Sequence, residues 1–145
     1  MKITNVKVQS FRQPVPESWK IHFGQTVDVT LVTITTDEGI EGYSTGRAVG
    51  GAWGTVLAHE IVSVAKRLVV GEDPLDREKI WQKMWKLGTR NRLSIFAMSC
   101  IDVALWDIAG KAANLPVYKL IGACRDKVAA YASSGVHRSV ESYVE

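Results

Sequence analysis

The chain has 145 residues, of which 46% are apolar and 23% charged, with 12 glycines and four prolines. This composition is typical of a folded globular protein and excludes a mainly disordered or fibrous chain. The formal net charge of +3 gives no general attraction to nucleic acid or to anionic lipid, so we expect neither as a partner. A chain of this length buries about 68–70% of its unfolded surface, which is enough for one domain with a real core.

The cysteines, the histidines and the N-terminus exclude further classes of protein. Cys100 and Cys124 are too few for a disulfide framework, and they lie in a predicted buried helix and a predicted helix end, so we expect both to be reduced. The three histidines form no zinc-binding motif. The chain shows neither the apolar run of a signal peptide nor a membrane-spanning stretch of about 18 residues. We therefore expect a cytoplasmic protein.

The first third of the chain alternates apolar and polar residues, which predicts strands over residues 3–11 and 26–36. Asp37-Glu38-Gly39 supplies a tight turn, and residues 40–44 continue as a returning antiparallel strand. Between the first two strands, residues 13–25 contain two prolines and lack any periodicity. They therefore predict a long loop, which we term the first loop.

Helical periodicity replaces this alternation after residue 54. The apolar residues Leu57, Ile61, Val64 and Leu68 share one face of a helix that ends at Gly71. Asp73 and Pro74 then offer an N-cap and a first helical residue for a second helix, which ends near Gly88.

A third helix over residues 93–113 is apolar nearly all round, which predicts that other elements cover it on several sides. Within it, Asp107 and Lys111 have the spacing of an intrahelical ion pair. Residues 115–122 predict a short fourth helix. Three tryptophans at helical spacing are interpreted as core residues: Trp81, Trp85 and Trp106.

The end of the chain contains an incomplete unit. Residues 127–132 predict a strand, and Ser139 could begin a helix, but only six residues remain before Glu145. A single strand followed by a helix start is the opening of a β-α unit, and one such unit cannot bury itself. We therefore expect this chain to be the front part of a longer protein.

A dense motif runs through residues 97–122, which read AMSCIDVALWDIAGKAANLPVYKLIG. With the preceding strands and helices, it resembles the enolase superfamily, in the branch of mandelate racemase and muconate lactonizing enzymes. The resemblance implies an α+β fold, with a three-stranded antiparallel meander followed by a helical bundle. By this resemblance, residues 1–122 match the N-terminal capping domain, and residues 123–145 match the first strand and helix start of a TIM-like barrel.

The resemblance also implies a chemistry. Members of the superfamily bind Mg²⁺ through three carboxylates at the ends of barrel strands, remove a proton α to a substrate carboxylate, and stabilise the enediolate on the metal. The expected outcome is dehydration or racemisation of a carboxylate-bearing small molecule, such as a sugar acid, by a homo-oligomer. Those ligands and bases lie on later strands, so we expect no catalytic residue and no cofactor in this chain. Asp102 and Asp107 are accordingly not metal ligands.

In this family, two loops of the capping domain close over the mouth of the barrel. They correspond to the first loop and to residues 45–54, which we term the second loop. Trp19 and His22 could contact a bound acid, Arg47 could neutralise its carboxylate, and Trp53 could seal the mouth. The alternative is a pair of ordinary surface loops whose aromatic side chains fold back on the sheet.

Other features are interpreted as structural. The glycines of the second loop lack the Lys and the hydroxyl residue of a phosphate-binding loop. Asp102 is expected to be a structural carboxylate that accepts backbone N–H groups or an arginine. A basic group in and after the second helix is expected to be a solvated face: Arg77, Lys79, Lys83, Lys86, Arg90 and Arg92. The alternative function is a catalytically silent, stand-alone binding or interaction module.

Overall fold

The computed structural model describes residues 1–17, 20, 24–47, 54–89 and 93–131. Three strands form one antiparallel sheet in the order β1-β2-β3, with β1 at Ile3–Pro14, β2 at Thr26–Thr36 and β3 at Glu41–Arg47. Alternate residues of β2, from Asp28 to Thr36, are buried, because one face of the sheet packs against the helices. The predicted antiparallel meander is confirmed.

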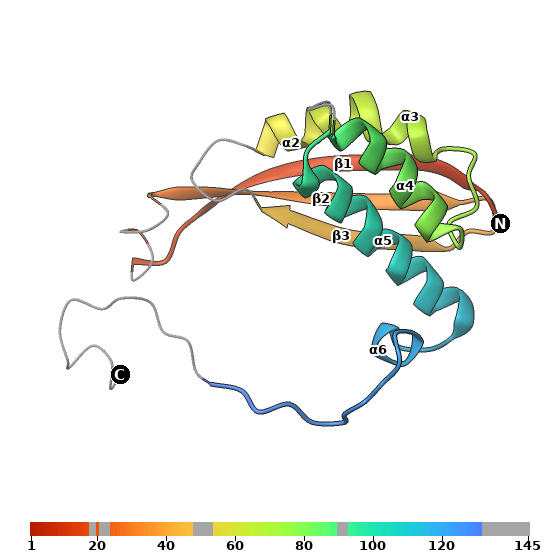
Figure 1. Cartoon of the computed structure of the whole chain (residues 1–145). Coiled ribbons are helices and arrows are strands. Elements are labelled where there is room, and N and C mark those ends of the chain that lie inside the picture. The colour runs from red at the N-terminus through yellow and green to blue at the C-terminus, as the bar shows by residue number, and fades with distance from the viewer. Residues whose placement is uncertain (18–19, 21–23, 48–53, 90–92, 132–145) are drawn as a thin grey trace.

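The helices cover one face of this sheet (Figure 1). They are α2 (Gly54–Glu60), η2 (Ile61–Ala65, a π-helical turn), α3 (Lys66–Val69), α4 (Arg77–Gly88), α5 (Ile95–Ala113) and α6 (Val117–Leu120). The elements α2, η2 and α3 follow one another without a break, and α5 lies across β3 and β2. In the described part of the chain, no helix has both the length and the apolar character needed to cross a membrane.

The core lies between the sheet and the helices that cover it, and α5 contributes the largest share of its buried residues. Ile101, Leu105 and Ile108 of α5 are fully buried together with Val32 and Ile34 of β2. Such side chains each contribute roughly 1.5–3 kcal/mol when they leave water, so this layer supplies much of the folding free energy.

At one point, β3 approaches α5 too closely for any side chain. A Cβ atom added at Gly42 would lie 2.1 Å from the backbone oxygen of Ala104 and 2.6 Å from Cγ1 of Ile108. Nearby, the Ser44 hydroxyl donates to the Cys100 oxygen at 2.6 Å, so a buried hydrogen bond joins the two elements directly. Glycine is therefore required at position 42 by packing.

The second helix begins later than predicted. Asp73 does not cap it; its carboxylate accepts the Leu75 N–H at 2.9 Å, and its carbonyl accepts the Asp76 N–H at 3.0 Å. An aspartate whose side chain holds a local turn competes with helix initiation. The helix therefore starts at Arg77, three residues after Pro74.

None of the three tryptophans is fully buried, contrary to the prediction that they are core residues, although Trp81 packs against the core. Ile80 and Met84 form the buried stripe of α4, so Trp81 and Trp85 lie at its margin, where their rings stack at 6.1 Å. Trp85 is 47% exposed, and Trp81 and Trp106 are half-buried. Both cysteines are free; Cys100 is buried in α5 as predicted, and Cys124 is exposed beyond the end of α6.

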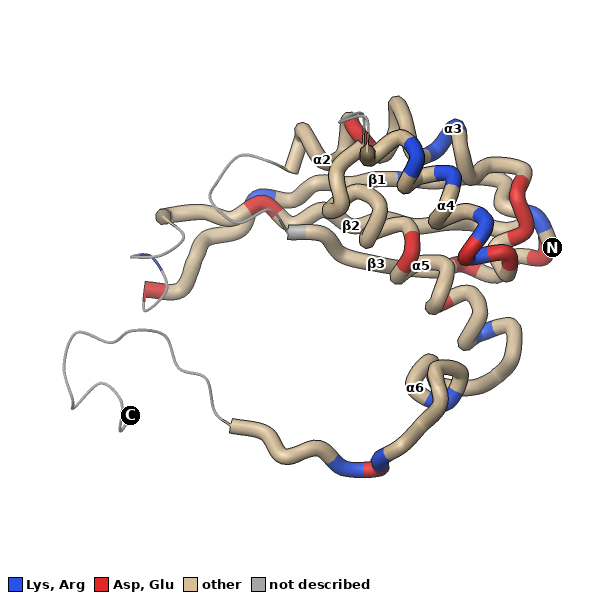
Figure 2. The backbone as a smooth tube through the Cα atoms, viewed as in Figure 1, with Lys and Arg blue, Asp and Glu red and all other residues tan. Residues whose placement is uncertain are grey.

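The lysines of α4 lie on a solvated face, as predicted, whereas Arg77 does not, because its guanidinium stacks on Trp106 and its Nε is buried. Lys79 and Lys83 both pair with Glu72, and basic and acidic segments alternate around α4 (Figure 2). Hydrogen bonds from the two lysines lower the pKa of Glu72 to about 2. Arg90 and Arg92 lie outside the described residues.

The predicted strand over residues 127–132 is not formed in residues 127–131. Residues 123–131 have no regular secondary structure, and Val128 and Tyr131 are 77% and 87% exposed. After α6 the chain runs away from the helices (Figure 1). A strand of a parallel barrel needs neighbours on both edges, and residues 127–131 have none among the described residues. The domain boundary after residue 122 stays a prediction.

Candidate functional site

The first loop and the second loop both begin at the same end of the sheet (Figure 1). At the base of the first loop, the Val15 N–H donates to the Gln25 oxygen at 3.0 Å, next to the last pair of the β1–β2 ladder. Within the second loop, Arg47 is the last residue of β3 and stands opposite Val29, while Gly54 is the first residue of α2. The ends of the two loops therefore share one scaffold.

A polar cluster holds the point where the second loop ends. Asp28 is only 6% exposed, and Arg12 donates to its two carboxylate oxygens from Nε at 2.8 Å and from Nη2 at 3.2 Å. The Gly54 oxygen accepts hydrogen bonds from the hydroxyls of Ser10 at 3.0 Å and Thr30 at 3.4 Å. The backbone N–H of Gly54 donates to Asp28. The Gly54 peptide is thus held to both β1 and β2.

The electrostatics of this cluster keep Asp28 ionised. The hydrogen bond from Arg12 lowers the pKa of the Asp28 carboxyl, and the charge of Arg12 and the Gly54 N–H act in the same direction against the effect of burial. Sequence reasoning missed this pair. Arg12 and Asp28 are direct cross-strand partners, so the alternation of the two strands could have placed them together once the register was known.

Replacing Asp28 by asparagine is expected to lower the melting temperature at pH 7. The folded pKa of Asp28 lies below 3.8, so its stabilising effect is present above that pH and is lost as the pH falls through the folded pKa. Thermal unfolding of the chain and of Asp28→Asn should therefore differ at pH 7 and converge below pH 3.8. Asp126→Asn, at an exposed site, is the control. If the two melting temperatures differed equally at both pH values, the ionised carboxylate of Asp28 would not be the stabilising group.

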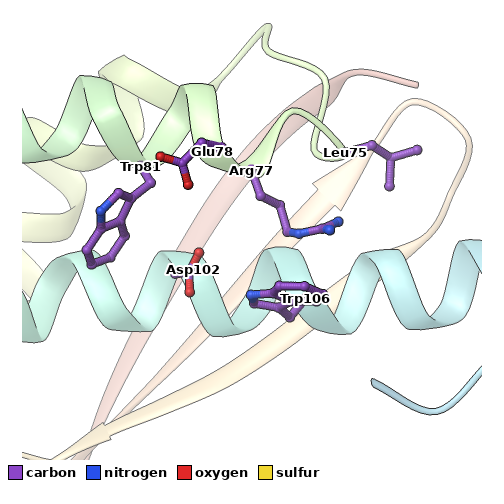
Figure 3. Close-up of a pocket in the computed structure, with 6 residues that line it drawn as sticks. All are labelled: Leu75, Arg77, Glu78, Trp81, Asp102 and Trp106. Atoms are coloured by element: carbon purple, nitrogen blue, oxygen red, sulfur yellow. The ribbon is translucent and has the colours of Figure 1, made fainter. Parts of the chain in front are cut away.

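A second site lies between α4 and α5, where a cavity of about 390 Å³ opens to the surface (Figure 3). The guanidinium of Arg77 lies 3.9 Å from the ring centre of Trp106, and its Nε is buried without a hydrogen-bond partner in the described part of the chain. Glu78 and Asp102 face one another between Trp81 and the stacked Arg77 (Figure 3). Burial raises the pKa of Asp102, Glu78 raises it further, and Arg77 opposes them.

Asp102 lacks the partners predicted for a structural carboxylate. Within the described residues, no hydrogen bond reaches its oxygens and no ion pair of 4 Å or less joins it to Arg77. Sequence reasoning could not find the cavity, because its walls come from separate helices.

Asp107, which follows Asp102 in the motif over residues 97–122, has a structural role. The carboxylate of Asp107 accepts the Tyr43 N–H at 2.8 Å and the Lys111 ammonium at 2.6 Å, which confirms the predicted pair. Lys111 also donates to the Glu41 oxygen at 2.7 Å. These bonds occupy backbone groups along β3, the edge strand next to α5.

No metal site is formed by the residues that the structure describes. They include no group of three or more His, Cys, Asp and Glu side chains close enough to hold an ion. The donor set of a magnesium site, several oxygen ligands around one ion, is thus not present in the described part of the chain.

Comparison with known proteins identifies the fold. Residues 2–122 match the family model described as "Mandelate racemase / muconate lactonizing enzyme, N-terminal domain". The chain belongs to this family. The matched region includes the three described strands, the described helices from α2 to α6 and the first and second loops.

Curated relatives of this capping domain include dehydratases of sugar acids. The chain is 38% identical over 114 residues to the L-talarate/galactarate dehydratase of Salmonella typhimurium, covering 75% of this chain and 28% of the relative. It is 35% identical over 145 residues to the D-galactonate dehydratase of Pectobacterium atrosepticum, covering 97% of this chain and 33% of the relative. The chain thus spans about a third of the length of the curated relatives it matches.

Solved structures share the capping-domain fold. A racemase from Streptomyces coelicolor with bound magnesium superposes with a TM-score of 0.73 at 28% identity, over 83% of this chain and 35% of that one. The dipeptide epimerase of Enterococcus faecalis, complexed with Mg and the dipeptide L-Leu-L-Tyr, superposes with a TM-score of 0.69 at 27% identity, over 85% and 35%.

The structure locates only part of the predicted substrate-contacting set of this capping domain. Trp19, His22 and Trp53 lie outside the described residues. The backbone of Arg47 is described as the end of β3, and its side chain is not. The structure therefore brings the ends of the two loops together, while the contact of these four side chains with a substrate stays a prediction.

Proposed function

We propose that this chain is the capping part of a magnesium-dependent enzyme that removes a proton α to a carboxylate, and that the enzyme dehydrates or racemises a sugar acid or related hydroxy acid. The family match supports this proposal, as do the curated dehydratases among the relatives. The family resemblance implies that magnesium and the catalytic base are held by polypeptide beyond residue 122, and the described residues include no group of three or more His, Cys, Asp and Glu side chains that could hold an ion.

The contribution of this chain is enclosure of the substrate. The observation that carries this assignment is the shared anchorage of the two loops, whose ends are held by the β1–β2 ladder and by the bonds to Gly54. Loops on a rigid scaffold can cover a bound acid reproducibly. Covering excludes water, and electrostatic interactions with a charged substrate are stronger in a water-excluded site.

The decisive experiment compares this chain with a protein in which it is joined to its native C-terminal continuation. We expect the joined protein to dehydrate or racemise at least one member of a panel of sugar acids and hydroxy acids with Mg²⁺, and to lose the activity with EDTA. We expect this chain alone to show neither turnover nor micromolar binding of Mg²⁺ by calorimetry. Turnover by this chain alone would contradict the proposal, and an inactive joined protein would favour the stand-alone binding module.

Within the joined protein, Arg47→Ala is expected to raise KM for the acid substrate. Loss of a charge-assisted contact costs about 1.5–3 kcal/mol, which corresponds to roughly tenfold or more in kcat/KM. Trp53→Ala should instead lower kcat by loosening the closed loop. Steady-state kinetics on the identified substrate measures both effects. Arg67→Ala, an exposed change on α3, is the matched control. Unchanged kinetics in both loop variants would contradict this assignment.

A further inference from the structure

The cavity between α4 and α5 has no role in the proposed enclosure of a substrate. Leu75, Arg77, Glu78 and Trp81 line it from the start of α4 and the turn before it, and Asp102 and Trp106 line it from α5. The loop ends, in contrast, are held by the strands and by the first residue of α2. The cavity is therefore a separate site.

The charges of the cavity are unbalanced. Two carboxylates and one guanidinium line it, and the guanidinium of Arg77 stacks on Trp106 without an ion pair of 4 Å or less to either acid. One oxygen of Glu78 accepts a hydrogen bond from Gln82 at 2.8 Å, and Asp102 accepts none from the described residues. Asp102 is half-buried and Glu78 is exposed, and two carboxylates that face one another favour a cation between them.

Trp81 and the Nε of Arg77, which has no partner among the described residues, favour a cation that is attached to a polypeptide. The half-buried indole of Trp81 borders the carboxylates, and an indole face attracts Lys and Arg side chains (Figure 3). On the other side, the buried Nε of Arg77 lacks an acceptor, and leaving a buried donor without a partner is costly. A backbone carbonyl close to the incoming basic side chain would satisfy this donor.

We propose that this cavity binds a basic side chain of a neighbouring polypeptide segment, with its cation between Glu78 and Asp102 and a carbonyl oxygen on Arg77. We assign that segment to the polypeptide that follows residue 122 in the complete enzyme, an assignment that rests on the proposed function. Trp106 also lines an adjacent cavity of about 470 Å³ with Val117 and Ile121, at the place where the chain leaves the domain. The polypeptide that follows is therefore tethered next to this surface.

The test uses N-acetyl-L-argininamide as the probe and N-acetyl-L-citrullinamide as its neutral control of similar size. Titration of this chain should shift the indole N–H resonances of Trp81 and Trp106 saturably with the first compound and not with the second. Asp102→Asn and Glu78→Gln should each weaken binding at least tenfold, while Asp126→Asn should leave it unchanged. Circular dichroism checks that each variant is folded.

Several outcomes would overturn the proposal. They are the absence of a saturable shift, equal shifts with the citrulline compound, and unchanged binding in both acidic variants. Sedimentation velocity tests the source of the segment, because a dimer of this chain that Asp102→Asn dissociates would assign the site to a second copy and overturn our assignment. Neither measurement depends on turnover, so failure of the cation site and failure of the proposed function are distinguishable.

Discussion

Replacing Gly42 by alanine is expected to destabilise the domain by about 3 kcal/mol or more, at the upper end of the usual cost of overpacking. The added Cβ would lie 2.1 Å from a backbone oxygen of α5, at Ala104. A flexible side chain could rotate away, but this oxygen belongs to the middle of a 19-residue helix, so β3 and α5 must separate. Urea unfolding followed by circular dichroism measures the loss.

The matched control is Gly88→Ala. There the new Cβ would meet the Met98 sulfur at 3.2 Å and the Leu93 oxygen at 3.3 Å. Methionine adapts readily, and alanine is favoured over glycine in a helix by about 1 kcal/mol, so we expect a net change within about 1 kcal/mol of zero. Equal losses in the two variants would show that the approach of β3 to α5 is not the cause.

The sheet was predictable because alternation along a strand reports one buried face. Residues 26–36 have the same limits in the structure as in the prediction, and every second side chain of that strand is buried. The ends of the other two strands were less predictable. β1 continues to Pro14 and β3 to Arg47, where pairing with β2 extends each strand beyond its apolar pattern.

The first helix shows where helical periodicity misleads. The predicted face contained Val64 and Leu68, but the fully buried residues are Ala65 and Val69. The π-helical turn over Ile61–Ala65 takes more residues per turn than an α-helix, so the buried positions recur at every fourth residue from Leu57. The spacing of apolar residues alone does not distinguish a regular α-helix from one with a π-helical turn, because Val64 and Leu68 still pack against the core.

The candidate sites were less accessible to sequence reasoning than the fold. Pairing of Arg12 with Asp28 depends on the register of β1 against β2, and a loop of uncertain length separates those strands in the sequence. The cavity around Arg77 depends on the angle between two helices. Trp19, His22 and Trp53 follow from the family resemblance and await the measurements on the joined protein.

Ile101→Ala is expected to destabilise the chain by about 2–5 kcal/mol, because it removes a fully buried side chain and leaves a cavity. Ile101 lies between Cys100, whose oxygen bonds Ser44, and the part of α5 that packs on Gly42, so its loss weakens the joint between β3 and α5. Because this packing is weakened, hydrogen exchange in β3, the strand that ends at Arg47, should also accelerate.

Val103→Ala on the same helix separates burial from helix propensity. Val103 is 53% exposed, and alanine is the better helix former, so this variant should unfold within about 0.5 kcal/mol of the unchanged chain. Urea unfolding and hydrogen exchange of both variants measure the difference. If Ile101→Ala lost no more stability than Val103→Ala, α5 would not be the central element of the core. The second loop would then be positioned by the hydrogen bonds to Gly54 alone.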